Sequence, residues 1–187
     1  MGGGSRRRSA RSWTPGQLGR AAMGKRAELE AEIGKLLVAR GWTLAAAESC
    51  TGGLLCHRLT NVPGSSRYFL GGVVSYANEV KTGLLGVRAD TVEAYGAVSS
   101  ETAREMAQRA RLLFAADVAL SVTGVAGPQG GTAVKPVGLV FLHLSAPGAE
   151  RGERRQWAGG RVENKAQSAE AALLLLRSFL DTEAAVR

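Results

Sequence analysis

Residues 45–53 read AAAESCTGG, and the rest of the chain is interpreted around them. Apolar segments lie on both sides of Ser49, so the pattern predicts a strand that turns tightly into a helix. Ser49 is then expected at a helix N-terminus, where free N–H groups and the helix dipole would stabilise the oxyanion formed when its hydroxyl attacks a carbonyl. Gly52 and Gly53 would let a ligand approach the backbone closely. The same residues also fit a simple helix cap with a glycine spacer, so this stretch alone leaves the choice open.

Length and composition predict one globular domain. The chain has 187 residues, 45% hydrophobic and 21% charged, which is ordinary for a soluble fold with a sizeable core. No apolar run approaches the roughly 20 residues that a membrane helix needs, so no membrane contact is expected. Cys50 and Cys56 lack the spacing of paired zinc ligands, and two thiols do not make the framework of a secreted disulfide-rich protein. A cytoplasmic location is therefore expected.

The net charge of +8 is concentrated in residues 1–25. That segment carries six basic residues and no acid; taking these from the total of 24 leaves 18 basic against 16 acidic, a net charge of +2 for residues 26–187. The glycine- and arginine-rich composition predicts a disordered tail over 1–25 and a folded domain over 26–187. The tail could contact nucleic acid or be an organelle transit peptide, with Met23 as an alternative start. Nucleic-acid binding is not expected elsewhere.

Hydrophobic periodicity and turn residues predict alternating helices and strands. Helices are expected over residues 28–40 (ended by Gly41), over 54–59, from Glu79 with Asn78 as its cap, after Ser99 or Ser100, and over 166–180. Strands are expected over residues 42–47, 71–76, 117–122, 137–144 and 154–157. The last connection between strands is too short for a parallel crossover, which predicts a mixed sheet. The fold class is therefore an α/β three-layer sandwich, a mixed β-sheet flanked by helices.

Neither of the two histidines is expected to serve a Ser-His-Asp triad. His57 lies two helical turns beyond Ser49, and His143 alternates within an apolar strand, so both are interpreted as structural or surface residues. A serine nucleophile would then need another base. Lys81, near the start of a helix and close to Tyr76, could act if burial or nearby positive charge lowers its pKa; the alternative is an ordinary solvated lysine.

The loop over residues 123–131 is rich in glycine. It lacks the Gly-Lys-Ser/Thr ending of a nucleoside-triphosphatase loop, which argues against that activity. It could bind a phosphate or complete an oxyanion site, with Lys135 and Arg161 as counter-charges, or it could be an ordinary turn.

Five motifs occur together in the chain. They are residues 47–53 (AESCTGG), 76–81 (YANEVK), 95–99 (YGAVS), 123–128 (TGVAGP) and 135–138 (KPVG). In this order they resemble the CinA C-terminal domain family, from about Leu29 to Leu180. The resemblance implies hydrolysis of the amide of nicotinamide mononucleotide to nicotinic acid mononucleotide and ammonia. It implies no metal and no cofactor, and a homo-oligomer is expected.

The resemblance also implies roles for individual residues. Ser49 is the nucleophile and Lys81 its general base. Tyr76, Thr123 and Arg161 surround the substrate and transition state. The candidate substrate-binding residues are Gly52, Gly53, Gly124, Gly127, Lys135 and Arg161.

The chain departs from the family pattern in two places. The family shows Gly-Asp-Arg and then a further arginine, whereas this chain has Gly159-Gly160-Arg161 with Lys165 at the later position. Because lysine cannot copy a bidentate arginine contact, substrate affinity is in doubt. No counterpart of the N-terminal molybdopterin-binding-like domain of longer relatives is found, so the chain resembles the stand-alone amidohydrolase.

A rival hypothesis is a non-catalytic nucleotide-binding or damage-response module whose basic tail recruits nucleic acid. Deleting residues 1–25 and titrating binding against salt would separate the two hypotheses, since phosphate contacts give a steep salt dependence.

Overall fold

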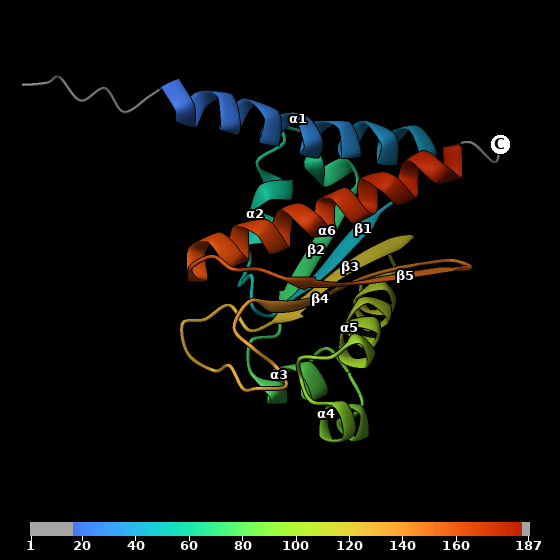
Figure 1. Cartoon of the computed structure of the whole chain (residues 1–187). Helices are drawn as coiled ribbons and strands as arrows, with labels where there is room; N and C mark the ends of the chain where they lie inside the picture. The colour runs from blue at the N-terminus through green and yellow to red at the C-terminus, as the bar shows by residue number, and fades with distance from the viewer. Residues whose placement is uncertain (1–16, 185–187) are drawn as a thin grey trace, which may run out of the picture.

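The computed structural model describes residues 17–184, which form one five-stranded sheet with helices on both sides (Figure 1). The strands are β1 (Leu44–Glu48), β2 (Phe69–Val74), β3 (Val118–Gly124), β4 (Leu139–Ala146) and β5 (Ala149–Gln156). Their order across the sheet is β2-β1-β3-β4-β5. β1 runs parallel to β2 and β3, whereas β4 is antiparallel to β3 and β5. The predicted mixed sheet is confirmed.

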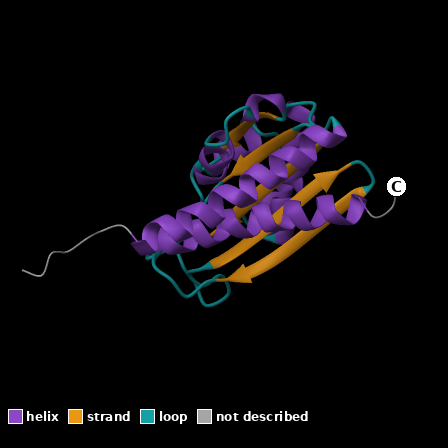
Figure 2. Cartoon of the chain, turned by 90° about the horizontal axis from the view of Figure 1, so that it is seen from above, coloured by secondary structure: helices purple, strands orange, loops and turns teal. Residues whose placement is uncertain are grey.

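The helices form the two outer layers, which confirms the three-layer α/β class (Figures 1 and 2). On one face α6 (Arg161–Ala184) packs against β3 and β4, and both α1 (Gln17–Arg40) and α2 (Leu54–Thr60) pack against α6. The other face is covered by α5 (Ser100–Leu113). Three short segments complete the fold: a 3₁₀ turn over Ser65–Arg67, α3 (Asn78–Gly83) and α4 (Ala89–Tyr95).

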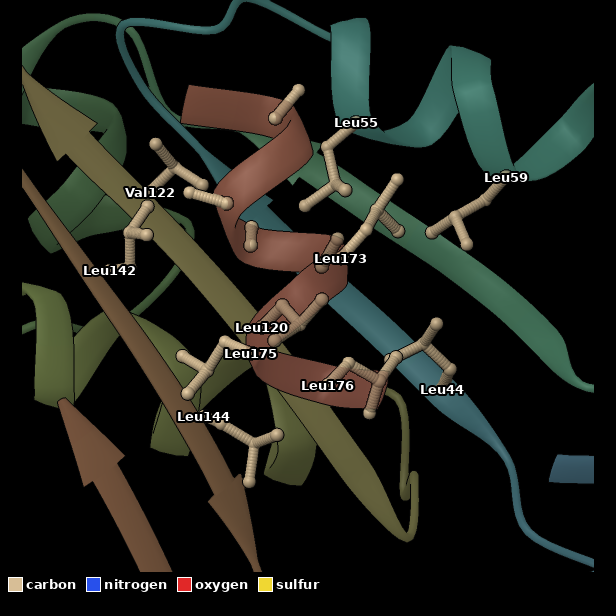
Figure 3. Packing of buried hydrophobic residues seen from close by; sticks show 14 of the residues in the cluster. Leu44, Leu55, Leu59, Leu120, Val122, Leu142, Leu144, Leu173, Leu175 and Leu176 are labelled. Atoms are coloured by element: carbon tan, nitrogen blue, oxygen red, sulfur yellow. The ribbon is translucent and has the colours of Figure 1, made fainter. Parts of the chain in front are cut away.

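The larger hydrophobic core lies between the sheet and the layer formed by α1, α2 and α6 (Figure 3). Its buried side chains include Leu44, Leu120, Val122, Leu142 and Leu144 from the strands and Leu55, Leu59, Leu173 and Leu176 from α2 and α6. Burying each leucine contributes roughly 1.5–3 kcal/mol, so this face provides most of the packing that holds the sheet in place.

Small side chains on the opposite sheet face let α5 approach closely. Successive strand residues point to opposite faces, so Ala45 and Ala47 of β1 join the α5 side while Leu44 joins the larger core. Met106 and Ala110 of α5 pack in the same cluster. Ala45 and Ala47 thus fit the narrow space between β1 and α5.

The ends of two helices test the predicted boundary signals. Gly41 has a φ of 64° and donates its N–H to the Val38 carbonyl, so it ends α1 as predicted. Ser99 caps α5, because its Oγ accepts the Thr102 N–H at 3.1 Å. Asn78 was expected to cap α3, but it is the first helical residue, and Ala77 occupies the cap position.

Other boundaries differ from the sequence-based expectation. α1 begins at Gln17 and so covers part of the segment assigned to a tail, whereas residues 1–16 lie outside the described residues. β5 begins at Ala149, well before the predicted 154–157 strand. The prediction missed its start because this edge strand is mostly polar and carries no hydrophobic alternation. α6 begins at Arg161 rather than at residue 166. α4 was not predicted.

Candidate active site

The candidate site lies where the three parallel strands end. β1, β2 and β3 finish at Glu48, Val74 and Gly124, and parallel strands bring their carboxyl ends to one edge of a sheet. A cavity of about 500 Å³ opens at this edge. Seven of the residues predicted from the sequence line it: Ser49, Tyr76, Lys81, Thr123, Gly124, Gly127 and Arg161.

Ser49 and Lys81 form a buried pair. Their exposed fractions are 7% and 1%, and Lys81 Nζ lies 3.1 Å from Ser49 Oγ. The same nitrogen donates to the backbone carbonyls of Ser75 at 2.7 Å and Tyr76 at 3.4 Å. Burial lowers the pKa of Lys81, partly opposed by Cys50 and Glu79. Lys81 is therefore not an ordinary surface lysine.

The loop that carries Ser49 differs from the prediction. α2 begins at Leu54, so Ser49 does not lie at the helix N-terminus. The amide groups of Gly53, Leu55 and Cys56 donate to the carboxylate of Glu48 instead of facing the cavity. The helix terminus therefore cannot supply the oxyanion site expected from the sequence.

Gly52 and Gly53 have a conformational role in this loop. Their φ angles are 61° and 93°, values that side chains other than glycine rarely adopt. They line a second hollow together with His57 and Lys165, apart from the cavity that contains Ser49. The prediction that they contact substrate beside Ser49 remains untested.

Arg161 links three segments at the mouth of the cavity. One guanidinium nitrogen donates to the Tyr76 hydroxyl at 2.6 Å and the other to the Gly127 carbonyl at 2.7 Å. The Tyr76 hydroxyl thus contacts Arg161, whereas Lys81 Nζ donates to the backbone carbonyl of the same tyrosine. Arg161 is also not among the groups that shift the pKa of Lys81.

The glycine-rich loop is shaped by close backbone approaches. Thr123 is fully buried and donates its hydroxyl to the Ala97 carbonyl at 2.7 Å. A Cβ on Gly124 would lie 2.6 Å from the Leu139 carbonyl oxygen, so only glycine fits. Gly127 has a φ of 86°. These constraints place loop residues 124–130 along one wall of the cavity.

Lys135 lies outside the candidate site. Its Nζ donates to the Tyr95 carbonyl at 2.6 Å, and its side chain lines a separate small hollow. The structure thus does not bring it together with Ser49, although the sequence analysis assigned it to substrate binding.

Neither histidine lines the cavity. His143 is 7% exposed and its Nε2 lies 2.6 Å from the Glu150 carboxylate, so of the two interpretations given from the sequence it is a structural residue rather than a surface one. Cys50 does line the cavity, but burial raises the pKa of its thiol to about 12. A thiol of that pKa stays protonated at neutral pH and is a poor nucleophile.

Sequence reasoning missed Glu48 and Ser75. Glu48 is fully buried and binds the start of α2, while the Ser75 carbonyl holds Lys81. Glu48 directly continues the apolar run of β1 and is its last residue. This continuity was the available signal that the acid is buried. The Ser75 contact uses the backbone, for which a sequence carries no residue-specific signal.

The fold and cavity define an α/β protein with a buried serine–lysine pair at the ends of parallel strands. The model of the CinA C-terminal domain matches residues 26–180, so the chain belongs to that family. A "CinA-like protein" of Chloroherpeton thalassium is 51% identical over 159 residues, 82% of this chain and 37% of the relative. A "putative competence-damage inducible protein" of Moorella thermoacetica is 51% identical over 148 residues, 79% of this chain and 36% of the relative. The chain thus spans little more than a third of these relatives.

Solved structures agree with this assignment over nearly their whole length. The competence/damage inducible protein CihA from Agrobacterium tumefaciens has a TM-score of 0.81 and 37% identity, covering 91% of this chain and 99% of that one. A CinA superfamily protein from Klebsiella pneumoniae has a TM-score of 0.81 and 34% identity, covering 84% and 98%.

Membrane-spanning helices and metal-binding clusters are both absent from the described part of the chain. None of its helices is long and apolar enough to cross a membrane. Within the same residues, no three His, Cys, Asp or Glu side chains gather closely enough to hold a metal ion.

Proposed function

We propose that the protein hydrolyses the carboxamide of nicotinamide mononucleotide to nicotinic acid mononucleotide and ammonia. The observation that carries the proposal is the 3.1 Å approach of Lys81 Nζ to Ser49 Oγ inside a cavity of about 500 Å³. The choice of substrate comes from the family resemblance. We place the reaction in the cytoplasm, which suits the two free thiols, Cys50 and Cys56.

The first step requires Lys81 to be a neutral amine. Such an amine has two N–H groups and one lone pair, which match the two carbonyl acceptors and the one hydroxyl around Nζ. The Ser49 hydroxyl gives its proton to Nζ while Oγ attacks the amide carbon. Because burial lowers the lysine pKa, the neutral form is more accessible at neutral pH than in a solvated lysine.

The remaining steps return the enzyme to its starting state. Protonated Lys81 gives its proton to the amide nitrogen, ammonia leaves, and an ester joins Ser49 Oγ to the acyl group. Water then attacks this ester after losing a proton to Lys81. The proton returns to Ser49 as the acid is released.

The developing oxyanion needs donors other than the start of α2. We assign it to the backbone N–H of Cys50, which directly follows the nucleophile, as in other serine hydrolases. This N–H donates to no other described residue, and Cys50 lines the cavity. Thr123 cannot supply a free hydroxyl proton while it donates to Ala97.

The substrate phosphate is assigned to Arg161 and the loop over residues 124–130. The Arg161 side chain binds a hydroxyl and a carbonyl, both neutral, and forms no ion pair with any described carboxylate. Its positive charge is therefore uncompensated at the cavity mouth, where a phosphate would pair with it.

Ammonia release over a panel of nicotinamide mononucleotide, nicotinamide riboside and free nicotinamide tests the proposal. We expect turnover of the mononucleotide, much weaker turnover of the riboside, and none with Ser49→Ala. Absence of ammonia release from the mononucleotide by folded wild-type protein would exclude this activity.

A further inference from the structure

The carboxylate of Glu48 sits at the centre of the loop that carries Ser49. Its Oε2 accepts the N–H groups of Gly53 at 2.9 Å and Leu55 at 3.1 Å, and its Oε1 accepts that of Cys56 at 2.8 Å. Glu48 has no measurable exposure and forms no ion pair with a described lysine or arginine. Backbone amides, including those that begin α2, therefore stabilise its charge.

These contacts close the loop on both sides of Ser49. The N–H of Ser49 donates to the Val122 carbonyl at 2.9 Å, which fixes the residue to β3. At the other end, Gly53 is tied back to the Glu48 side chain. The two left-handed glycines, Gly52 and Gly53, allow the chain to turn within this short span.

The backbone of Glu48 also connects to the residues that hold Lys81. Its carbonyl accepts the Ser75 N–H at 2.8 Å, and the Ser75 carbonyl accepts from Lys81 Nζ at 2.7 Å. Glu48 thus contacts both the loop that carries Ser49, through its side chain, and Ser75, which holds Lys81, through its backbone.

We propose that Glu48 is a positioning residue that holds Ser49 Oγ within hydrogen-bond distance of Lys81 Nζ. This inference rests on the proposed function insofar as it takes Ser49 and Lys81 to be the reacting pair. Glu48 touches neither side chain through its carboxylate, so it acts through the loop rather than on the substrate.

Glu48→Gln is the sharpest change because it keeps the volume and removes one acceptor. Glutamine has one acceptor oxygen, and its amide –NH₂ would face either the Cys56 N–H or the N–H pair of Gly53 and Leu55. Two donors in contact repel, so the loop must shift. Because displacements near 1 Å from productive geometry reduce rates by about 100-fold, we expect kcat to fall about 10- to 100-fold with KM changed by less than about threefold.

Glu105→Gln is the matched control. Glu105 is also a buried carboxylate that accepts several bonds, from Arg88 N, Arg88 Nε and Thr91 Oγ1, but it lies on α5 outside the cavity. Both variants are expected to lower the melting temperature. Only Glu48→Gln is expected to lower kcat per folded molecule. Should Glu48→Gln not fold, Glu48→Asp keeps the charge with a shorter reach and is expected to show the same split between kcat and KM.

A second readout separates this inference from the choice of substrate. The rate at which a fluorophosphonate labels Ser49 reports the reactivity of the hydroxyl without any nucleotide. We expect slower labelling in Glu48→Gln than in wild type and Glu105→Gln. If wild type labels but does not hydrolyse the nucleotide, the proposed function fails while the labelling rates still decide the role of Glu48.

Three results would overturn the role of Glu48. Labelling and kcat in folded Glu48→Gln that equal those of wild type would show that the loop needs no carboxylate. Equal losses of activity in the Glu48 and Glu105 variants would show a general effect on the fold. A wild-type protein that neither labels at Ser49 nor turns over the nucleotide would overturn both proposals.

Discussion

The parallel and antiparallel halves of the sheet offer two different hollows. A groove of about 540 Å³ lies beside β5 and α6 in the antiparallel half and is lined by Trp157, Leu174 and Leu175 among others. The cavity in the parallel half, at about 500 Å³, is similar in size but contains the Ser49 and Lys81 pair. Size therefore does not distinguish the candidate site. The parallel strands distinguish it, because their carboxyl ends bring polar residues from separate loops to one edge of the sheet.

Of the changes in either half of the sheet, Ser49→Ala should reduce turnover the most. Removing the attacking oxygen should lower kcat by about 10⁴-fold or more, with little change in melting temperature because little packed volume is lost. Steady-state ammonia release and thermal unfolding measure both quantities. Cys50→Ala is the control for the neighbouring thiol, and loss of turnover there but not in Ser49→Ala would make Cys50 the nucleophile.

Lys81→Arg should lower kcat by about 10³-fold, because arginine stays protonated and cannot accept the serine proton. Since burial lowers the pKa of Lys81, the rate in wild type should rise with pH through an apparent pKa below the ordinary lysine value of about 10.4. The pH profile of kcat/KM measures this limb. If Lys81→Arg kept a kcat near that of wild type, Lys81 would not be the general base and would only contact the substrate or its neighbours.

Arg161→Met should raise KM for nicotinamide mononucleotide about 10- to 100-fold, the scale of a charge-assisted hydrogen bond of roughly 1.5–3 kcal/mol. The same change should leave the weak activity on nicotinamide riboside unaltered, since the riboside has no phosphate. Comparing kcat/KM for both substrates measures the difference. A parallel loss on both would indicate that Arg161 supports Tyr76 and Gly127 rather than a phosphate.

Lys81→Met should stabilise the fold by about 1 kcal/mol, which corresponds to a rise of a few °C in melting temperature. The folded pKa of Lys81 is lowered by burial, so protonation of this lysine favours the unfolded chain and opposes folding at pH values below its unfolded pKa. This penalty should shrink as pH rises from the folded pKa toward the unfolded value. Thermal unfolding of both proteins at pH 7 and pH 10 tests the sign, and a gap that widens at pH 10 would contradict it.

Leu174→Ser, in the antiparallel-half groove, should have the smallest effect. Leu174 is 51% exposed, so kcat and KM should stay within about twofold and stability within about 0.5 kcal/mol. The same assays provide the measurement. A large loss of turnover would mean that the two halves are coupled.

The sequence was informative where local pattern and position agreed. The strand before Ser49, the cap at Ser99 and the end of α1 at Gly41 follow from residue types that act within a few positions. The sequence also suggested Lys81 as the base for a Ser49 nucleophile, and in the structure Lys81 Nζ lies 3.1 Å from Ser49 Oγ.

Other features depend on contacts that no local pattern records. β5 is a polar edge strand, so its extent is set by pairing with β4 rather than by its own residues. The bond between Arg161 and Tyr76 joins residues 85 positions apart. The occupation of the α2 amides by Glu48 depends on the exact direction of one side chain, which spacing alone cannot give.

The position of Arg161 at the first residue of α6 has a consequence for biosynthesis. Ser49, Tyr76 and Lys81 emerge from the ribosome long before α6, which also brings Leu173 and Leu176 to the sheet. Because α6 must be made and docked before Arg161 can reach Tyr76 and Gly127, the nascent chain would contain Ser49 and Lys81 while this wall of the cavity is still missing. Under the proposed function, a chain still being synthesised would therefore lack its phosphate-binding arginine.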